Sequence, residues 1–81
     1  MFANTPQQLG LVFRDLRERQ GMTQQEAAAW AGLKPKTVSG FETGKVRIRI
    51  DTLLKLFAAV GAVMDVKSEE EMEAFQRTVE W

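Results

Sequence analysis

The sequence contains no cysteine and no histidine. Without cysteine the chain can form neither a disulfide framework nor a thiolate metal site, and without histidine it lacks the commonest metal ligand and general base. No apolar run approaches the roughly 20 residues that cross a bilayer, and the first letters, MFANTPQQ, lack the charged-then-apolar pattern of a signal peptide. We therefore expect a soluble cytoplasmic protein that is not an enzyme, does not associate with a membrane and holds no metal or other cofactor.

The chain has no net charge, because its 11 basic and 11 acidic residues cancel. The two signs are unevenly placed. Residues 1–50 carry eight basic against four acidic residues, a net charge of +4, and residues 51–81 carry three against seven, a net charge of −4. This asymmetry indicates a basic binding face beside an acidic tail, although two ordinary solvated surfaces would give the same count. With 81 residues the chain is expected to form one domain.

Local signals divide the first 61 residues into helices. Thr5 and Pro6 mark a helix start, with a glutamine three residues after the threonine completing a capping box, and Thr23 with Glu26 forms a second box. Apolar residues then recur at helical spacing up to the glycines that end each helix. We expect helices over residues 6–20, 24–31, 35–43 and 51–60. The glycine inside the first of them, Gly10, indicates close packing at that point.

The C-terminal segments follow a different pattern. Residues 62–67, AVMDVK, have the interleaved apolar pattern of a short strand, and no other segment of the chain offers a ladder partner. The fourth helix is apolar on more than one face, so we expect a homodimer in which this strand pairs with its twofold mate. The candidate dimerisation residues are Leu54, Val63, Met64 and Val66. Residues 68–81 form an acidic tail that is either helical to about residue 78 or disordered when unbound.

The second and third expected helices together form a recognisable motif. Ala28 is small enough for the two helices to cross closely, and Gly32 permits the sharp turn between them. Leu33 and Val38 would fill the angle between the helices, and Phe41 would anchor the second one. The letters QQEAAAWAGLKPKTVSGFET, followed by GK, resemble the repressor-type helix-turn-helix family of phage and bacterial regulators.

A narrower resemblance extends beyond this motif. The order of four-helix head, short strand, acidic tail and final Glu80-Trp81 is similar to the HipB-type antitoxins. The resemblance implies an all-α, repressor-like domain of four to five helices with a short C-terminal strand that forms an intersubunit lid in a dimer. It also implies repression of an operon and binding of a HipA-type serine/threonine kinase toxin. We accordingly divide the chain into a helix-turn-helix DNA-binding domain (1–61), a dimerisation strand (62–67) and a tail (68–81).

The expected DNA contacts follow from the motif. The third helix should present its outward face and N-terminal end to base edges, where lysine addresses guanine O6 and N7 and hydroxyl groups donate or accept. The base-reading candidates are Lys34, Lys36, Thr37 and Ser39. The phosphate-binding candidates are Thr23, Gln24, Gln25, Lys45 and Arg47. The alternative for the two lysines, and for Arg49, is an ordinary solvated surface.

The aromatic residues indicate a protein partner. Trp30 takes a position that the motif usually gives to a polar residue, so it is either an exposed partner contact or a cover for the tail, and packing within the protein or its dimer is the preferred interpretation. Trp81 ends a tail that offers its indole little local core, so this side chain either enters a pocket of a partner protein or is disordered. The candidate partner-binding residues are Trp30, Phe75 and Trp81. The glutamates of the tail point to different faces of a helix and are assigned to solvent.

Our leading hypothesis is a nucleoid-associated repressor that binds an inverted-repeat operator and acts as the antitoxin of a HipA-type kinase. One alternative is a stand-alone helix-turn-helix repressor without a toxin. Another is an interaction adaptor that has lost DNA binding, against which the basic residues of the third helix argue.

Overall fold

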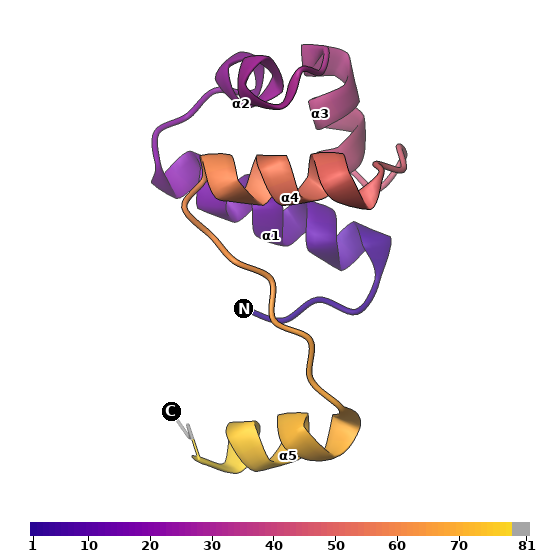
Figure 1. Cartoon of the computed structure of the whole chain (residues 1–81), viewed down its shortest axis with the longest axis vertical. Helices are drawn as coiled ribbons and strands as arrows, with labels where there is room; N and C mark the ends of the chain where they lie inside the picture. The colour runs from indigo at the N-terminus through magenta and orange to yellow at the C-terminus, as the bar shows by residue number, and fades with distance from the viewer. Residues whose placement is uncertain (79–81) are drawn as a thin grey trace.

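The computed structural model describes residues 1–78, with side chains described up to residue 75, and this part of the chain contains five helices and no strand (Figure 1). The helices are α1 (Pro6–Arg19), α2 (Gln24–Ala31), α3 (Pro35–Glu42), α4 (Ile50–Ala59) and α5 (Glu69–Thr78). Helices α1–α4 form a head, and an extended linker, residues 62–68, leads from it to α5. The expected all-α class and the first four helices are confirmed. No helix within residues 1–78 combines the length and apolar character needed to cross a membrane.

Side-chain caps begin α1 and α2. Thr23 Oγ1 accepts the backbone N–H of Glu26 at 3.0 Å, and the Glu26 carboxylate accepts that of Thr23 at 3.0 Å, which confirms the expected capping box. The bond from the Thr23 backbone lowers the pKa of Glu26 below its ordinary value. At α1, Thr5 Oγ1 accepts from Gln8 N–H at 3.1 Å, but the Gln8 side chain accepts from the backbone of Asn4 at 2.9 Å. The reciprocal half of the first expected box is therefore displaced by one residue.

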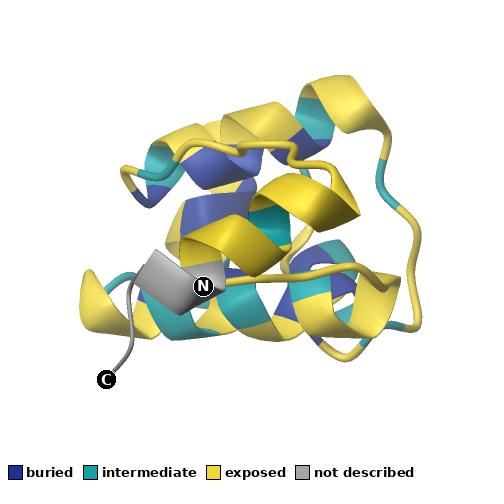
Figure 2. Cartoon of the chain, turned by 90° about the horizontal axis from the view of Figure 1, so that it is seen from below, coloured by how far each residue is buried: buried dark blue, intermediate teal, exposed yellow. Residues whose placement is uncertain are grey.

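Three phenylalanines occupy the centre of the head. The fully buried ring of Phe13 lies 5.7 Å from that of Phe41 and 5.6 Å from that of Phe57, measured between centroids. Val38 and Leu56 beside them are also fully buried. Figure 2 shows the buried positions of the helices turned toward the middle of the head. Because each such side chain contributes about 1.5–3 kcal/mol on burial, this core holds α1, α3 and α4 in one arrangement.

A close helix crossing at Gly10 sets α1 against the end of α3. A Cβ atom at this position would lie 3.0 Å from the carbonyl oxygen of Glu42 and would overlap the carbonyl oxygen of Phe41. Only a residue without a side chain lets the two backbones come so near. The predicted close packing is confirmed, and it accounts for a glycine in a helix interior, where glycine costs about 1 kcal/mol relative to alanine.

The linker forms neither helix nor strand. The strand expected over residues 62–67 is thus absent from the single chain, because a strand needs a ladder partner and no second strand exists within residues 1–78. Its two valines stay in solvent, with Val63 92% and Val66 91% exposed. Beyond it, Ser68 Oγ accepts the backbone N–H of Glu71 at 3.2 Å and caps α5. Of the two expectations for the tail, the described residues adopt the helical one.

Candidate nucleic-acid interface

Helices α2 and α3 pack against each other around a tight turn. The buried face of α2 consists of small side chains: Ala27, Ala28 and Ala31. Gly32 ends the helix with a φ of 69°, in the left-handed region that favours glycine, and the N–H of Leu33 donates to the Ala28 carbonyl at 2.8 Å. Figure 1 shows α2 and α3 together at one end of the molecule, the end away from α5. The predicted small helix face and glycine turn are both confirmed.

The four base-reading candidates lie on α3 and on the residue before it. Lys34 is the N-cap residue of α3, and its side chain makes no capping hydrogen bond. Lys34 and Lys36 are exposed and Thr37 and Ser39 are half-buried, whereas Val38 in their midst points into the core. The structure therefore brings the four polar side chains to the outer side of one helix.

The phosphate-binding candidates do not form one group. Gln25, Lys45 and Arg47 are exposed, and so is Thr23, whose hydroxyl oxygen accepts the capping bond. Gln24 differs from the expectation, because its side-chain amide donates to Glu42 Oε1 at 3.0 Å. This bond directs Gln24 toward the interior of the head rather than toward a DNA backbone.

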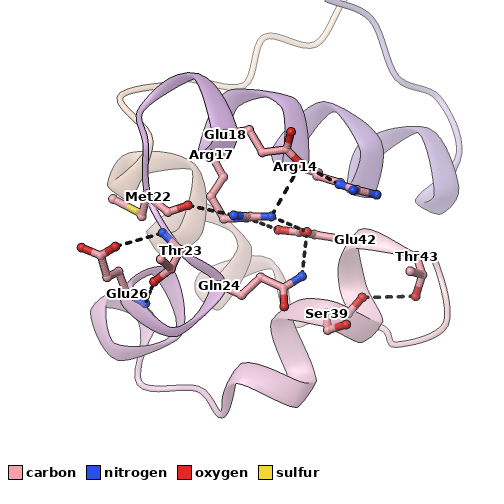
Figure 3. Close-up of polar contacts among 10 residues, drawn as sticks. All are labelled: Arg14, Arg17, Glu18, Met22, Thr23, Gln24, Glu26, Ser39, Glu42 and Thr43. Carbon is pink, nitrogen blue, oxygen red and sulfur yellow. Dashed lines mark hydrogen bonds and ion pairs between the residues drawn. The ribbon is translucent and has the colours of Figure 1, made fainter.

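A buried ion pair joins the helix-turn-helix to α1 (Figure 3). Arg17 Nε donates to Glu42 Oε2 at 2.6 Å and Arg17 Nη2 donates to Glu42 Oε1 at 3.1 Å. Arg17 Nη1 also donates to the carbonyl of Met22, just before α2, at 2.8 Å. The side chain of Glu42 is 2% exposed and that of Arg17 is 11% exposed. The hydrogen bond to Glu42 raises the pKa of Arg17, so the guanidinium stays charged.

This ion pair, with the bond from Gln24, sets where α3 faces. It ties together α1, the residue before α2 and the last turn of α3, so the outer face of α3 is held relative to the head. The sequence analysis did not predict this network of Arg17, Glu42 and Gln24, although the spacing of the two charged residues from core residues indicates it. Arg17 follows the core residue Phe13 by four positions and Glu42 follows Val38 by four, so both charges fall on inward helix faces. Opposite charges at inward positions of two helices predict a buried pair.

A contact between Gly40 and Val46 holds the loop that follows α3. The N–H groups of Lys45 and Val46 both donate to the Gly40 carbonyl, at 2.8 and 3.1 Å. A Cβ atom at Gly40 would lie 3.0 Å from Val46 Cβ and would overlap a Val46 methyl group. The loop therefore folds back onto α3 and keeps Lys45 and Arg47 beside it. In the sequence this contact is indicated by Gly40, because a glycine inside a predicted helix is explained by close packing at that point.

Ion pairing decides where the positive charge of the head remains. Each arginine of α1 has a carboxylate partner: Arg14 with Glu18 at 2.8 Å, Arg17 with Glu42, and Arg19 with Asp15 at 2.9 Å. Within residues 1–75, four basic side chains around α3 form no ion pair: Lys34, Lys36, Lys45 and Arg47. We call these four residues the basic patch. A cationic patch beside outward-facing hydroxyl groups has the electrostatics of a nucleic-acid-binding surface.

Comparison with known proteins assigns the chain to a family. A family model described as a helix-turn-helix domain matches residues 8–71. The antitoxin HipB of Escherichia coli O6:H1 (strain CFT073) is 30% identical over 80 residues, which cover 95% of this chain and 85% of that protein. The chain belongs to the HipB-type helix-turn-helix family. It therefore carries a helix-turn-helix DNA-binding domain, and its relatives are DNA-binding antitoxins rather than enzymes.

Solved structures agree with this assignment. This HipB-type chain matches HipB(S29A) in a complex with an O2 20mer at a TM-score of 0.74 and 26% identity, over 85% of this chain and 96% of that chain. It matches HipB in the HipA-HipB-O2-O3 complex equally well, over 97% of that chain. The clp gene regulator ClgR of Corynebacterium glutamicum matches at a TM-score of 0.70 and 27% identity, over 74% of this chain and 64% of that one.

The partner-binding candidates of this HipB-type protein lie in three different situations. Trp30 on α2 is 65% exposed in the single chain, so packing within its own chain is wrong, and packing within a dimer stays a prediction. The buried face of α2 consists of Ala27, Ala28 and Ala31, and Trp30 lies on the helix outside that face, so its ring remains in solvent. Phe75 on α5 is 38% exposed and touches the ring of Phe2. Trp81 lies outside the described residues.

The dimerisation candidates are apolar and exposed. Their exposed fractions are 52% for Leu54, 92% for Val63, 39% for Met64 and 91% for Val66. Ile50, one turn before Leu54 on α4, is 63% exposed, and sequence analysis does not single it out. Two large aliphatic side chains four residues apart form a ridge on a helix, which exposes more apolar surface than a monomeric head requires.

Proposed function

We propose that this protein represses transcription by binding an inverted-repeat operator as a homodimer and that it neutralises a HipA-type serine/threonine kinase toxin. The basic patch carries the DNA half of the proposal, since it places cations without ion-pair partners at the N-terminal end of α3 and in the loop that follows it, α3 being the second helix of the helix-turn-helix. Membership of the HipB-type family supports the toxin half. The matched complex that contains both HipA and HipB supports it further.

The DNA-binding mechanism assigns a different role to each group of side chains. Helix α3 enters the major groove, where Lys34 and Lys36 address guanine and the hydroxyls of Thr37 and Ser39 bond to neighbouring base edges. Phosphate oxygens are bound by side chains on either side of the groove: Thr23, Gln25, Lys45 and Arg47. Gln24 acts indirectly, because its bond to Glu42 helps to hold α3 at its angle.

The homodimer covers the exposed apolar residues of α4 and the linker. In this arrangement residues 62–67 gain the ladder partner that the single chain lacks and pair antiparallel with their twofold mate. Leu54, Val63, Met64 and Val66 become buried between the two chains. Val66→Pro removes a backbone donor and should weaken the dimer in a sedimentation experiment. A protein that stays monomeric at micromolar concentration would contradict this arrangement.

A salt titration of duplex binding tests the DNA half. Each phosphate contact contributes about −0.9 to the slope of log affinity against log salt concentration. Lys45→Ala should therefore make the slope less steep, its magnitude falling by about 1. Lys55 on α4 is an exposed lysine away from the basic patch, so Lys55→Ala is a matched control and should leave the slope unchanged. A protein without salt-dependent duplex binding would be the interaction adaptor instead.

Co-purification with the kinase tests the toxin half. A HipA-type kinase expressed together with this protein should be retained by it and lose its kinase activity. Operator binding without retention of any such kinase would instead identify a stand-alone repressor.

A further inference from the structure

The N-terminal segment and α5 meet through their aromatic rings. The ring of Phe2 lies 5.6 Å from that of Phe75, and the two planes make an angle of 84°, an edge-to-face contact. Lys67 Nζ lies 5.7 Å from the centroid of the Phe75 ring and 2.6 Å from Asp65 Oδ2. The N-terminal segment, the linker and α5 therefore converge on one ring. Phe2, Lys67 and Phe75 together are called the aromatic clasp below.

Helix α5 draws little support from the head. The buried core and the apolar residues packed against it all lie between Leu9 and Ala62. A helix of 10 residues is marginal in water without tertiary contacts, because its nucleation is unfavourable. The aromatic clasp supplies such a contact, and the Ser68 cap closes the first turn. The folding of α5 in the free protein thus depends on a residue at the opposite end of the chain.

The clasp leaves part of each ring open. Phe2 is 45% exposed and Phe75 is 38% exposed. The first half of α5 presents exposed carboxylates: Glu69, Glu70, Glu71 and Glu73. A short helix with an accessible aromatic ring and exposed acids around its first half is complementary to a protein groove that is apolar at its base and basic at its rim.

We propose that the aromatic clasp keeps α5 folded in the free protein and that the clasped helix docks into an apolar groove with a basic rim on a partner protein. This rests on the proposed function, in which the kinase toxin bears the groove. A helix ordered in advance loses less conformational entropy on docking. DNA is a poor partner for α5, because the carboxylates of α5 repel phosphates and α5 lies at the end of the molecule away from α3 (Figure 1).

Hydrogen exchange of the free, full-length protein tests the clasp itself. Phe2→Ala should raise the exchange rates of α5 amides by about 2- to 10-fold, the factor that corresponds to one edge-to-face ring pair. Amides of α1–α4 should be unaffected. Phe2→Tyr keeps the ring and should restore slow exchange. Leu11→Ala removes a comparably exposed apolar side chain from α1 and serves as the control. Unchanged α5 exchange in Phe2→Ala would overturn the clasp.

Calorimetric binding to a co-expressed HipA-type kinase tests the docking. Phe2→Ala should weaken this binding by the same factor, about 2- to 10-fold, and leave duplex affinity unchanged. Equal or tighter kinase binding would overturn the docking role, since the clasp would then be neutral or would hide Phe75. A loss of duplex affinity instead would assign the surface to DNA and overturn it as well. Absence of kinase binding by the unaltered protein would refute the toxin half of the proposed function, whereas the exchange measurement decides the clasp separately.

Discussion

The head and α5 are held by contacts of the same kinds but of very different burial. In the head, three packed phenylalanine rings surround a fully buried Phe13, and the Arg17–Glu42 pair lies almost out of solvent. At α5, the ring pair is partly exposed and the Asp65 carboxylate of its ion pair is 70% exposed. Water competes for the contacts at α5 but is excluded from those at the centre of the head. The head thus has one rigid geometry, whereas α5 can exchange its contacts for those of a partner at small cost.

This difference suits the two surfaces to the two tasks proposed for them. Reading base edges requires side chains held to a fraction of an ångström, and the buried network behind α3 provides that. Docking to a protein tolerates a mobile element, provided that the element is folded often enough to bind. The following predictions test this contrast, beginning with the largest expected effect.

Breaking the buried ion pair should damage the protein far more than breaking the exposed one. Glu42→Ala leaves the Arg17 guanidinium in the interior without its partner, and we expect a loss of about 3–5 kcal/mol in the free energy of unfolding. Asp65→Ala breaks the exposed pair with Lys67 and should cost less than about 1 kcal/mol. Urea unfolding followed by circular dichroism measures both. Equal losses would show that burial does not separate the two regions.

Removing a base contact should cost specific affinity without affecting stability. We expect Lys34→Ala to lose about 1–3 kcal/mol of binding to the operator, because a lysine contact to guanine is lost. Arg47→Ala should weaken operator and random duplex alike, since it touches phosphate. Lys55→Ala is the control for the loss of one positive charge. If Lys34→Ala discriminated between operator and random duplex as well as the unaltered protein does, α3 would not be the reading helix.

Loss of the α2 cap should have a smaller effect, and one that depends on pH. Thr23→Ala removes the hydroxyl that accepts the Glu26 N–H, which costs about 0.5–2 kcal/mol of stability. The pKa of Glu26 is lowered in the folded protein, so its carboxylate stabilises the fold above the ordinary value of 4.5 and stops doing so as the pH falls through the folded pKa. Urea unfolding between about pH 3 and pH 7 should therefore show a weaker pH dependence in Glu26→Gln, which lacks the carboxylate, whereas Thr23→Ala keeps the backbone N–H that lowers the pKa of Glu26. An unchanged pH profile in Glu26→Gln would contradict the role of the box.

Removing the tail should affect the head least of all. Deletion of residues 70–81 removes most of α5 but nothing from the core, so the stability of the head should change by less than about 0.5 kcal/mol. Duplex affinity should be retained and kinase binding lost. Melting, duplex binding and kinase binding can be measured on one preparation. Lost operator affinity would show that the tail belongs to the DNA-binding domain, and retained kinase affinity would exclude Phe75 and Trp81 as anchors.

Much of the head could be predicted because its signals are local. The Thr23–Glu26 box, the glycine at position 32 and the helical spacing of apolar residues act within a few residues of one another. Gly10 also predicted close packing from a local signal, because glycine inside a helix is unfavourable unless a neighbouring backbone approaches closely. The outward position of Lys34 and Lys36 followed from the helical period once Val38 was assigned to the core.

The sequence by itself thus determined the helices, the turn between α2 and α3 and the uneven charge of the two halves. Only the tertiary structure decided which charges remain available, because pairing depends on side chains brought together across the fold. Arg17 finds Glu42 across 25 positions, and Gln24 turns to the same carboxylate instead of to solvent. The tertiary structure also left Trp30 exposed, and residues 62–67 without a strand partner among the described residues. Burial and strand pairing each need two segments in contact, and a local sequence pattern describes only one of them.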